Sequence, residues 1–453
     1  MSSRARQAAA PLYLFLCLIL GGSAQGIWAN MLLQLLGLAL IAWAALAPAD
    51  APVAASARQL LLIALLALVL IAIQMVPLPP AIWTHLGGRA ELASGYAVLG
   101  IAPPWLPLST APYRTLGALL SLLPPLALYC VMLRPGTYRP GWLIATLIAG
   151  TIAGILLGAL QVSSGDPNTS HWYLYAESSF GVASGFFANA NHMATLLVVT
   201  LPFLAALYAS VRGGNRQRAT AVLVLLAGVG LVVFVGILLN RSLAAYGLTP
   251  PVLAASALIL LGQRSRWRRW TLLLAGLLLI AAVAALATSS IRGSQLERDA
   301  PTSLQTRQEM LATTAKAVGD FMPWGSGLGS FRSVYQLYED PGRVTNTYVI
   351  HAHNDYVELA LETGLPGVLL TVLFLAWWTR ASWRAWSADG GPYARAASIA
   401  SAAVLVHSVV DFPLRTAAIA SVFAMCLALL GERRPPPVRT RSDLWPTRHV
   451  VVK

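Results

Sequence analysis

The sequence predicts an all-α polytopic membrane protein with about twelve transmembrane helices. Of its 453 residues, 57% are hydrophobic and only 11% are charged, whereas soluble globular proteins carry about 25% charged residues. The hydrophobic residues come in blocks of about 18 or more, the length that crosses the hydrocarbon core of a bilayer. Most basic residues lie in short gaps between these blocks, where positive charge sets the orientation of a membrane protein. These observations exclude a soluble globular fold.

Twelve hydrophobic blocks account for the predicted spans. They cover residues 11–25, 29–47, 58–76, 114–132, 141–160, 192–210, 220–240, 244–262, 271–289, 357–378, 396–410 and 415–431. The first block follows Arg4 and Arg6 and is interrupted by glycine, so it also resembles a signal peptide. We expect it to be a retained span, because the second block follows almost at once.

The basic residues predict the orientation. If the N-terminus lies in the cytoplasm and twelve spans alternate, every dense basic cluster faces the cytoplasm, including residues 264–269 and the basic tail 432–453. This arrangement satisfies the positive-inside rule along the whole chain. Both termini are therefore expected in the cytoplasm.

The same alternation places the long hydrophilic segments on the outer face. The predicted regions are spans one to nine within 1–289, with outward loops near 77–113 and 161–191, a large outward loop at 290–356, and spans ten to twelve within 357–431. The large loop is expected to contain a helix near Leu304–Val318. No inward loop is comparable in length, so we expect the function on the outer face.

Composition and cysteine usage limit the function classes. The formal net charge is +14, but the chain has no basic–aromatic module of the kind that binds nucleic acid. Cys17, Cys130 and Cys426 lie inside hydrophobic blocks, where cysteine behaves as a small apolar residue. Neither a disulfide framework nor a thiolate metal site is expected.

The most informative segment, HAHNDYVELALETGLPG at residues 351–367, opens the tenth span. Helical spacing places Asn354, Glu358 and Glu362, or nearby Asp355, along one face. Ionisable groups at the mouth of a membrane helix are costly unless they face water or a partner, which favours a functional site. The alternative is an interfacial helix start that Asn354 or Asp355 caps.

Two arginines give a second indication of chemistry. Arg241 lies in a short turn between two spans, and Arg307 lies in the large outward loop. Guanidinium groups bind phosphate oxygens in pairs and stay charged at any working pH, so these two could hold a diphosphate without a metal ion. Arg241 could instead snorkel to the interface, and Arg307 could be an ordinary solvated helix residue.

Other polar residues near the outer ends of the spans have weaker support. Asn189 and Asn191 could cap the sixth span or face a ligand, and His192 could be a buried, hydrogen-bonded structural residue. His407 and Asp411 stand one helical turn apart and are expected to form a packed polar pair that braces the site.

Two further features receive a structural interpretation. His351 is expected to be a solvated loop residue, although it could assist His353. The glycines at 325, 327 and 329 indicate a flexible turn, because a phosphate-binding loop would also need lysine followed by serine or threonine.

Six segments, in this order and spacing, carry a resemblance. They are the proline-rich loop 78–109, FANANH at 187–192, NRS at 240–242, PWGSGLGSF at 323–331, HNDY…ETG…G at 353–367 and HSVVDFP at 407–413. With them the chain resembles the O-antigen ligase and polymerase superfamily of polytopic bacterial membrane glycosyltransferases. The resemblance covers most of the chain and is strongest from about 180 to 415. One departure is Asn240, where family members often have serine before the turn arginine.

The resemblance implies an inverting, metal-independent transfer of a glycan from undecaprenyl diphosphate to an acceptor hydroxyl, on the periplasmic face of the bacterial inner membrane. In the family pattern two arginines hold the diphosphate and one histidine lies near the acceptor hydroxyl, and Arg241, Arg307 and His353 match these positions. The implied partners are the lipid-linked donor, lipid A-core or a glycan as acceptor, and membrane lipid, with no cofactor and no nucleic acid. Supporting roles fall to Asn189, His192, His351, Asn354, Asp355, Glu358, Glu362, His407 and Asp411.

Several alternatives stay open at this point. A lipid A-core acceptor defines a ligase, a carrier-linked acceptor defines an O-unit or exopolysaccharide polymerase, and a protein acceptor is disfavoured because the last outward loop is short. A lipid-linked glycan transporter would show internal repeats and charged residues at span centres, which the sequence lacks. A metal-dependent mechanism would need Asp355, Glu358 and Glu362 to gather around an ion.

Overall fold

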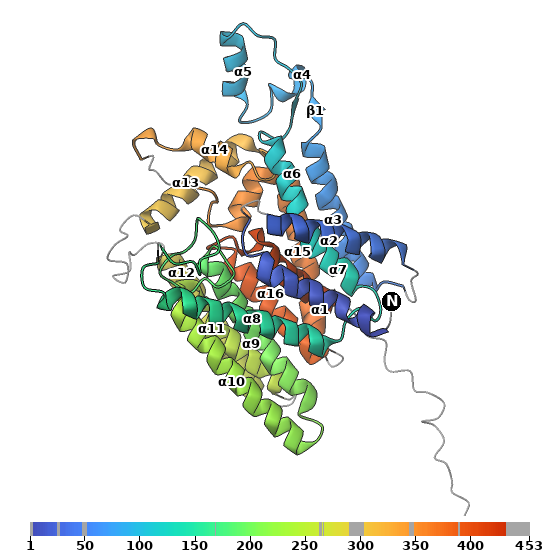
Figure 1. Ribbon diagram of the computed structural model, residues 1–453. Coiled ribbons are helices and arrows are strands. Elements are labelled where there is room, and N and C mark those ends of the chain that lie inside the picture. The colour runs from blue at the N-terminus through green and yellow to red at the C-terminus, as the bar shows by residue number, and fades with distance from the viewer. Residues whose placement is uncertain are drawn as a thin grey trace, which may run out of the picture.

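The computed structural model describes residues 3–24, 28–47, 52–167, 169–261, 265, 267–289, 303–343, 348–387 and 390–431. These residues fold mostly into helices, and Figure 1 shows the arrangement. In chain order the elements are α1 (Ser3–Leu20), α2 (Trp28–Leu46), α3 (Ala55–Gln74), β1 (Pro77–Leu78), α4 (Pro80–Trp83), α5 (Ala90–Val98), β2 (Leu106–Pro107), α6 (Pro112–Ser121), α7 (Leu123–Met132), α8 (Pro140–Ser163), α9 (Ala190–Val211), α10 (Arg216–Asn240), α11 (Leu243–Leu260), α12 (Trp267–Ser289), α13 (Ser303–Phe321), α14 (Phe331–Tyr338), the 3-10 turn η1 (Pro341–Arg343), α15 (Asp355–Ala385), α16 (Pro392–His407), the 3-10 turn η2 (Pro413–Arg415) and α17 (Ala417–Gly431). The predicted all-α polytopic class is confirmed.

Helices occupy all twelve predicted span positions, with α6 and α7 together filling the fourth. Within the described residues, eight helical segments are long and apolar enough to cross a membrane. Helices α16 and α17 are shorter, with 16 and 15 residues. The number of spans and their orientation therefore stay predictions.

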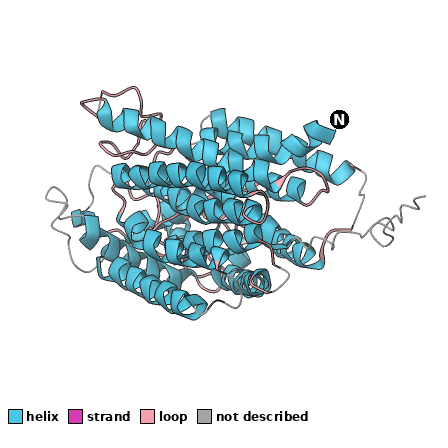
Figure 2. Cartoon of the chain, turned by 90° about the horizontal axis from the view of Figure 1, so that it is seen from below, coloured by secondary structure: helices cyan, strands magenta, loops and turns pink. Residues whose placement is uncertain are grey.

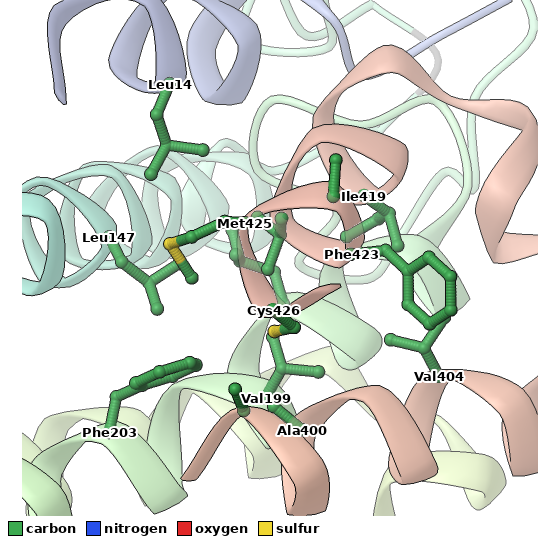
Figure 3. Close-up of a cluster of buried hydrophobic side chains, with 14 of the residues drawn as sticks. Leu14, Leu147, Val199, Phe203, Ala400, Val404, Ile419, Phe423, Met425 and Cys426 are labelled. Atoms are coloured by element: carbon green, nitrogen blue, oxygen red, sulfur yellow. The ribbon is translucent and has the colours of Figure 1, made fainter. Parts of the chain in front are cut away.

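The core of the bundle lies where α1, α8, α9, α16 and α17 meet. Figure 3 shows Leu14, Leu147, Phe203, Val404 and Met425, one from each of these helices, converging on one apolar cluster. Seen from below, the helices of the bundle run side by side (Figure 2). Most residues of α17 are buried, so this short helix is enclosed by other helices, and its length need not match the thickness of a bilayer.

The predicted loop 77–113 has structure of its own. Strands β1 and β2 pair antiparallel, with Pro77 opposite Pro107 and Leu78 opposite Leu106. The segment between them carries α4 and α5 and projects beyond the ends of α3 and α6 (Figure 1). The buried Trp83 ring closes this projection by donating its indole N–H to the carbonyl of Pro104 at 2.8 Å.

The predicted large loop contains α13 and α14, so the helix expected over Leu304–Val318 is confirmed. The two helices pack on each other and on the start of α15 through a small apolar cluster that includes Phe321 and Phe331. Residues 290–302 and 344–347 of this loop, and the predicted tail 432–453, lie outside the described residues.

The turn between α13 and α14 fixes a kink in α15. Gly325 and Gly364 both have positive φ, 79° and 59°, and a Cβ on Gly364 would lie 2.2 Å from the carbonyl oxygen of Pro323. The amides of Ser326 and Gly327 donate to carbonyls of α15 at 2.9 Å. The expected glycine turn is present, and its glycines permit close packing of backbone against backbone.

Candidate active site

Four chain segments meet at one end of the bundle. They are the start of α9, the turn from α10 to α11, the segment 351–358 that opens α15, and the turn from α16 to α17 that holds η2. Hydrogen bonds from Asn191 link the first, second and fourth of these segments. The segment 351–358 joins through backbone contacts to the end of α16, including Asp355 N–H to Ser408 O at 2.9 Å.

His353 has a backbone conformation that few residues adopt. Its φ is 50°, in the left-handed region where histidine is enriched among non-glycine residues. This backbone turn places its Nδ1 atom 3.3 Å from Oδ1 of Asp411, with 27% of the His353 side chain exposed. The ring also contacts Phe412, with centroids 5.0 Å apart. His353 is thus held against the protein on one side and open to a ligand on the other.

Asp411 is buried and held by donors on both carboxylate oxygens. Oδ2 accepts from Nδ2 of Asn191 at 2.6 Å, and Oδ1 accepts from the amide of Phe412 at 2.9 Å. Burial alone would raise the pKa of Asp411, but the His353 imidazole outweighs burial and, with His192 and His407, holds this pKa below its ordinary range. The Asp411 carboxylate is therefore charged at neutral pH.

Arg241 ends α10 in the left-handed conformation, with φ 58° and ψ 19°. Its side chain is exposed. The residue before it, Asn240, is buried and donates from Nδ2 to the carbonyls of Ala183 and Ala190 at 2.7 and 2.8 Å. A serine hydroxyl has one proton to donate, so Asn240 ties two segments where the commoner serine would tie one. The buried Oδ1 of Asn240 has no hydrogen-bond partner among the described residues.

The turn of Arg241 connects to His353 through side chains. Ser242 donates from Oγ to Oδ1 of Asn191 at 2.8 Å, and Asn191 donates in turn to Asp411. Asp411 faces His353. Two hydrogen bonds and the 3.3 Å approach of His353 to Asp411 thus connect the predicted arginine turn to the predicted histidine.

Asn354 caps α15. Its side-chain oxygen accepts from the amides of Tyr356 and Val357, both at 3.1 Å, and its Nδ2 donates to the carbonyl of Val409 at 2.9 Å. The capping alternative is therefore correct for Asn354, which also fastens the helix start to the turn that carries Asp411. Asp355 is the first residue of the helix and does not cap it.

Three carboxylates of α15 surround a residue that the sequence analysis did not select, Arg415 of η2. The guanidinium lies 3.3 Å from Asp355, 3.2 Å from Glu358 and 3.4 Å from Glu362. Glu358 and Glu362 are fully buried, so the expected shared face of α15 is confirmed. Within the described residues, the positive partner of these carboxylates is an arginine, as buried charges require.

Glu358 also holds the segment that carries His353. Its Oε1 lies 2.8 Å from Nδ1 of His351, and its Oε2 accepts from the amide of Ala352 at 2.8 Å. The expectation that His351 is a solvated loop residue is wrong, because its imidazole packs between Glu358 and the ring of Phe412, whose centroid is 4.3 Å away.

Two further histidines lie beneath the site. His407 is buried and its Nδ1 pairs with the hydroxyl of Thr195 at 2.7 Å, whereas Asp411 accepts from Asn191. The predicted pairing of His407 with Asp411 stays a prediction. His192 is buried between Phe187 and Phe412, and neither ring nitrogen has a hydrogen-bond partner among the described residues. The expected hydrogen bonding of His192 is therefore wrong, while its burial is confirmed.

The remaining predicted residues are placed less completely. Asn189 is the N-cap of α9 and accepts from the amide of Asn191 at 2.8 Å. Arg307 lies in α13, but its side chain is outside the described part of the structure. Its predicted contact with the diphosphate stays a prediction.

Taken with the membrane helices, the arginine turn and the histidine–carboxylate pair define a polytopic membrane protein with a polar site at one end. The family model for O-antigen ligase matches residues 228–372. This match confirms the resemblance to the O-antigen ligase and polymerase superfamily and supports a ligase-like or polymerase-like membrane glycosyltransferase. It includes Arg241, Arg307 and His353, whereas Asn191 and Asp411 lie outside it. No curated protein matches the chain significantly.

Proposed function

We propose that this protein transfers a glycan from undecaprenyl diphosphate to a hydroxyl of lipid A-core, on the periplasmic face of the bacterial inner membrane. The observation that carries the proposal is the pairing of His353 with the buried Asp411 at 3.3 Å. A carboxylate facing Nδ1 favours the tautomer protonated there, which leaves the Nε2 lone pair for a substrate. With this lone pair, His353 can accept a proton as a general base.

Arg241 is the residue proposed to hold the donor. Its guanidinium is exposed at the end of α10, and no hydrogen bond or ion pair joins it to another residue in the described part of the chain. Its positive charge is free to neutralise an anionic ligand, and its fork geometry matches two phosphate oxygens. Arg307 is proposed as the second guanidinium of this clamp, as the family pattern implies.

The reaction is a displacement at the anomeric carbon of the donor. The acceptor oxygen forms the new C–O bond from the face opposite the diphosphate, so the anomeric configuration inverts. His353 takes the hydroxyl proton as the bond from the anomeric carbon to the diphosphate oxygen breaks. The diphosphate leaves with both bonding electrons, and the arginines stabilise the charge that it gains.

Replacement of His353 tests the base. Asparagine also adopts the left-handed conformation readily, so His353→Asn removes the imidazole while keeping the backbone, and His353→Ala is its comparison. We expect both purified variants to bind lipid-linked donor but to transfer glycan at least about 10²-fold more slowly, the lower value of a general base. Transfer at the wild-type rate by either folded variant would exclude His353 as the base.

Chelation tests the metal-independent part of the proposal. The carboxylates that might have bound an ion surround Arg415 instead. We therefore expect EDTA to leave the transfer rate unchanged. If EDTA abolishes transfer and one divalent ion restores it, the reaction depends on a metal ion and the metal-independent proposal is wrong.

The acceptor is tested by a gene deletion followed by gel and mass-spectrometric analysis of surface glycans. A ligase leaves full-length carrier-linked glycan beside bare lipid A-core when it is deleted. If single repeat units accumulate instead, the protein is an O-unit or exopolysaccharide polymerase with the same donor site.

A further inference from the structure

We propose that Asn191 is a positioning residue that joins the Arg241 turn to the His353–Asp411 pair, so that the donor-binding and proton-accepting groups keep one spacing. The inference rests on the proposed function. It concerns a residue in α9 that lies outside the matched family region. One amide makes two hydrogen bonds of opposite direction, and these support the inference.

The two ends of the Asn191 amide are chemically different and both are used. Its Nδ2 donates to Asp411 at 2.6 Å, and its Oδ1 accepts from the hydroxyl of Ser242 at 2.8 Å. A carboxylate can only accept, and here the Ser242 hydroxyl donates, so one amide orientation satisfies both partners. Neither aspartate nor leucine could make both contacts.

The backbone of Asn191 is itself fixed. Its amide donates to the side chain of Asn189, and its carbonyl accepts from the hydroxyl of Thr195 at 2.9 Å. The neighbouring carbonyl of Ala190 accepts from Asn240, the residue before Arg241. The start of α9 therefore contacts the arginine turn through both its backbone and a side chain. Among the described hydrogen bonds, its link to Asp411 is the one made by the Asn191 side chain.

This arrangement has a direct consequence for a displacement reaction. His353 acts on the attacking hydroxyl and the arginines act on the leaving diphosphate, on opposite sides of the anomeric carbon. The distance between these groups must therefore suit a single in-line geometry. A misplacement of about 1 Å in such a site can cost about 10²-fold in rate. Asn191 touches neither the His353 ring nor the Arg241 guanidinium through any described hydrogen bond, and it acts through Asp411 and Ser242.

Two variants separate the ends of the amide. Asn191→Asp keeps an acceptor for Ser242 but loses the donor to Asp411 and adds a second negative charge beside it. We expect kcat to fall at least about tenfold, as a lost charged hydrogen bond would give, while the KM for the lipid-linked donor changes little. Asn191→Leu loses both contacts and should lower kcat and raise the donor KM together.

Asn215→Ala is the matched control. It removes the N-cap of α10, which accepts from the amide of Arg218 at 3.2 Å, and it leaves every contact of Asn191 in place. A purely structural role predicts that Asn215→Ala and Asn191→Leu change only thermal stability and have equal kinetic constants. That result, or wild-type kcat in Asn191→Asp, would overturn the inference. Failure of the proposed function is recognised separately, because His353→Asn would then retain transfer.

Discussion

Two arginines at the same end of the bundle have opposite surroundings. Arg415 lies within 3.4 Å of carboxylate oxygens from Asp355, Glu358 and Glu362. Arg241 ends a helix with its side chain exposed, and in the described structure it has no carboxylate partner. The charge of Arg415 stabilises the protein, whereas the charge of Arg241 is available to a ligand. Loss of Arg415 should therefore damage the fold, and loss of Arg241 should damage the reaction.

The largest effect is expected from Arg415→Met. Removing one partner of a buried ion pair costs about 3–5 kcal/mol, because the remaining charges stay buried without compensation. We expect the unfolding midpoint of Arg415→Met in detergent to be much lower than that of the wild type. The midpoint of Arg415→Lys should lie between the two. Arg241→Met should keep the wild-type midpoint. Equal midpoints for Arg415→Met and Arg241→Met would contradict the comparison.

Arg241→Met should instead reduce transfer. Loss of one group that stabilises charge in a transition state costs about 10²–10³-fold in rate. Arg241→Lys keeps the charge but loses the paired contact with phosphate oxygens, so its rate should lie between those of the methionine variant and the wild type. The measurement is glycan transfer from purified lipid-linked donor. Full activity in Arg241→Met would show that the exposed arginine does not contact the diphosphate.

Gly364→Ala tests whether the kink of α15 holds the carboxylates around Arg415. An alanine with φ near 59° is strained, and its Cβ would meet the carbonyl of Pro323. We expect a loss of about 1–3 kcal/mol in unfolding free energy. Gly319→Ala in α13 is the control, because its Cβ would meet no atom within 4 Å. If both variants unfold at the same temperature, the kink does not matter for stability.

The smallest effect is the pH dependence of the Asp411 contribution. The folded-state pKa of Asp411 is lowered, so the stability that its carboxylate adds is fully present above the unfolded value of about 3.9. That stability is lost only as the pH falls through the lower folded value. The difference in unfolding free energy between wild type and Asp411→Asn, about 1 kcal/mol, should not decrease from pH 7 to pH 5. A difference that vanishes by pH 6 would refute the lowered pKa.

The fold class followed from the sequence because block length and charge placement are local properties. The twelve hydrophobic blocks all became helices, and the cap at Asn354 came from a local preference of short polar residues. The paired strands of the loop 77–113 were not predicted, because strands of two residues give no periodic pattern.

The site was predicted in part, for a related reason. Asn354 and Glu358 share one segment, whereas Asn191 and Asp411 are 220 positions apart, and nothing in their local sequence indicates the contact. Arg415 is the first residue of the last hydrophobic block, and that position does not indicate a contact with α15. One signal was present: three acids on one helix face need a positive partner, and no basic residue lies beside them in the sequence.

The position of Asp411 and Arg415 between the last two helices has a consequence for biosynthesis. A chain that leaves the ribosome N-terminus first carries His353, Glu358 and Glu362 before their partners exist. Until the turn from α16 to α17 is made, His353 has no Asp411 beside it, Glu362 has no Arg415, and Glu358 has only the His351 imidazole. A nascent chain stopped before that turn would therefore carry the acids of α15 without the arginine that neutralises them in the folded protein.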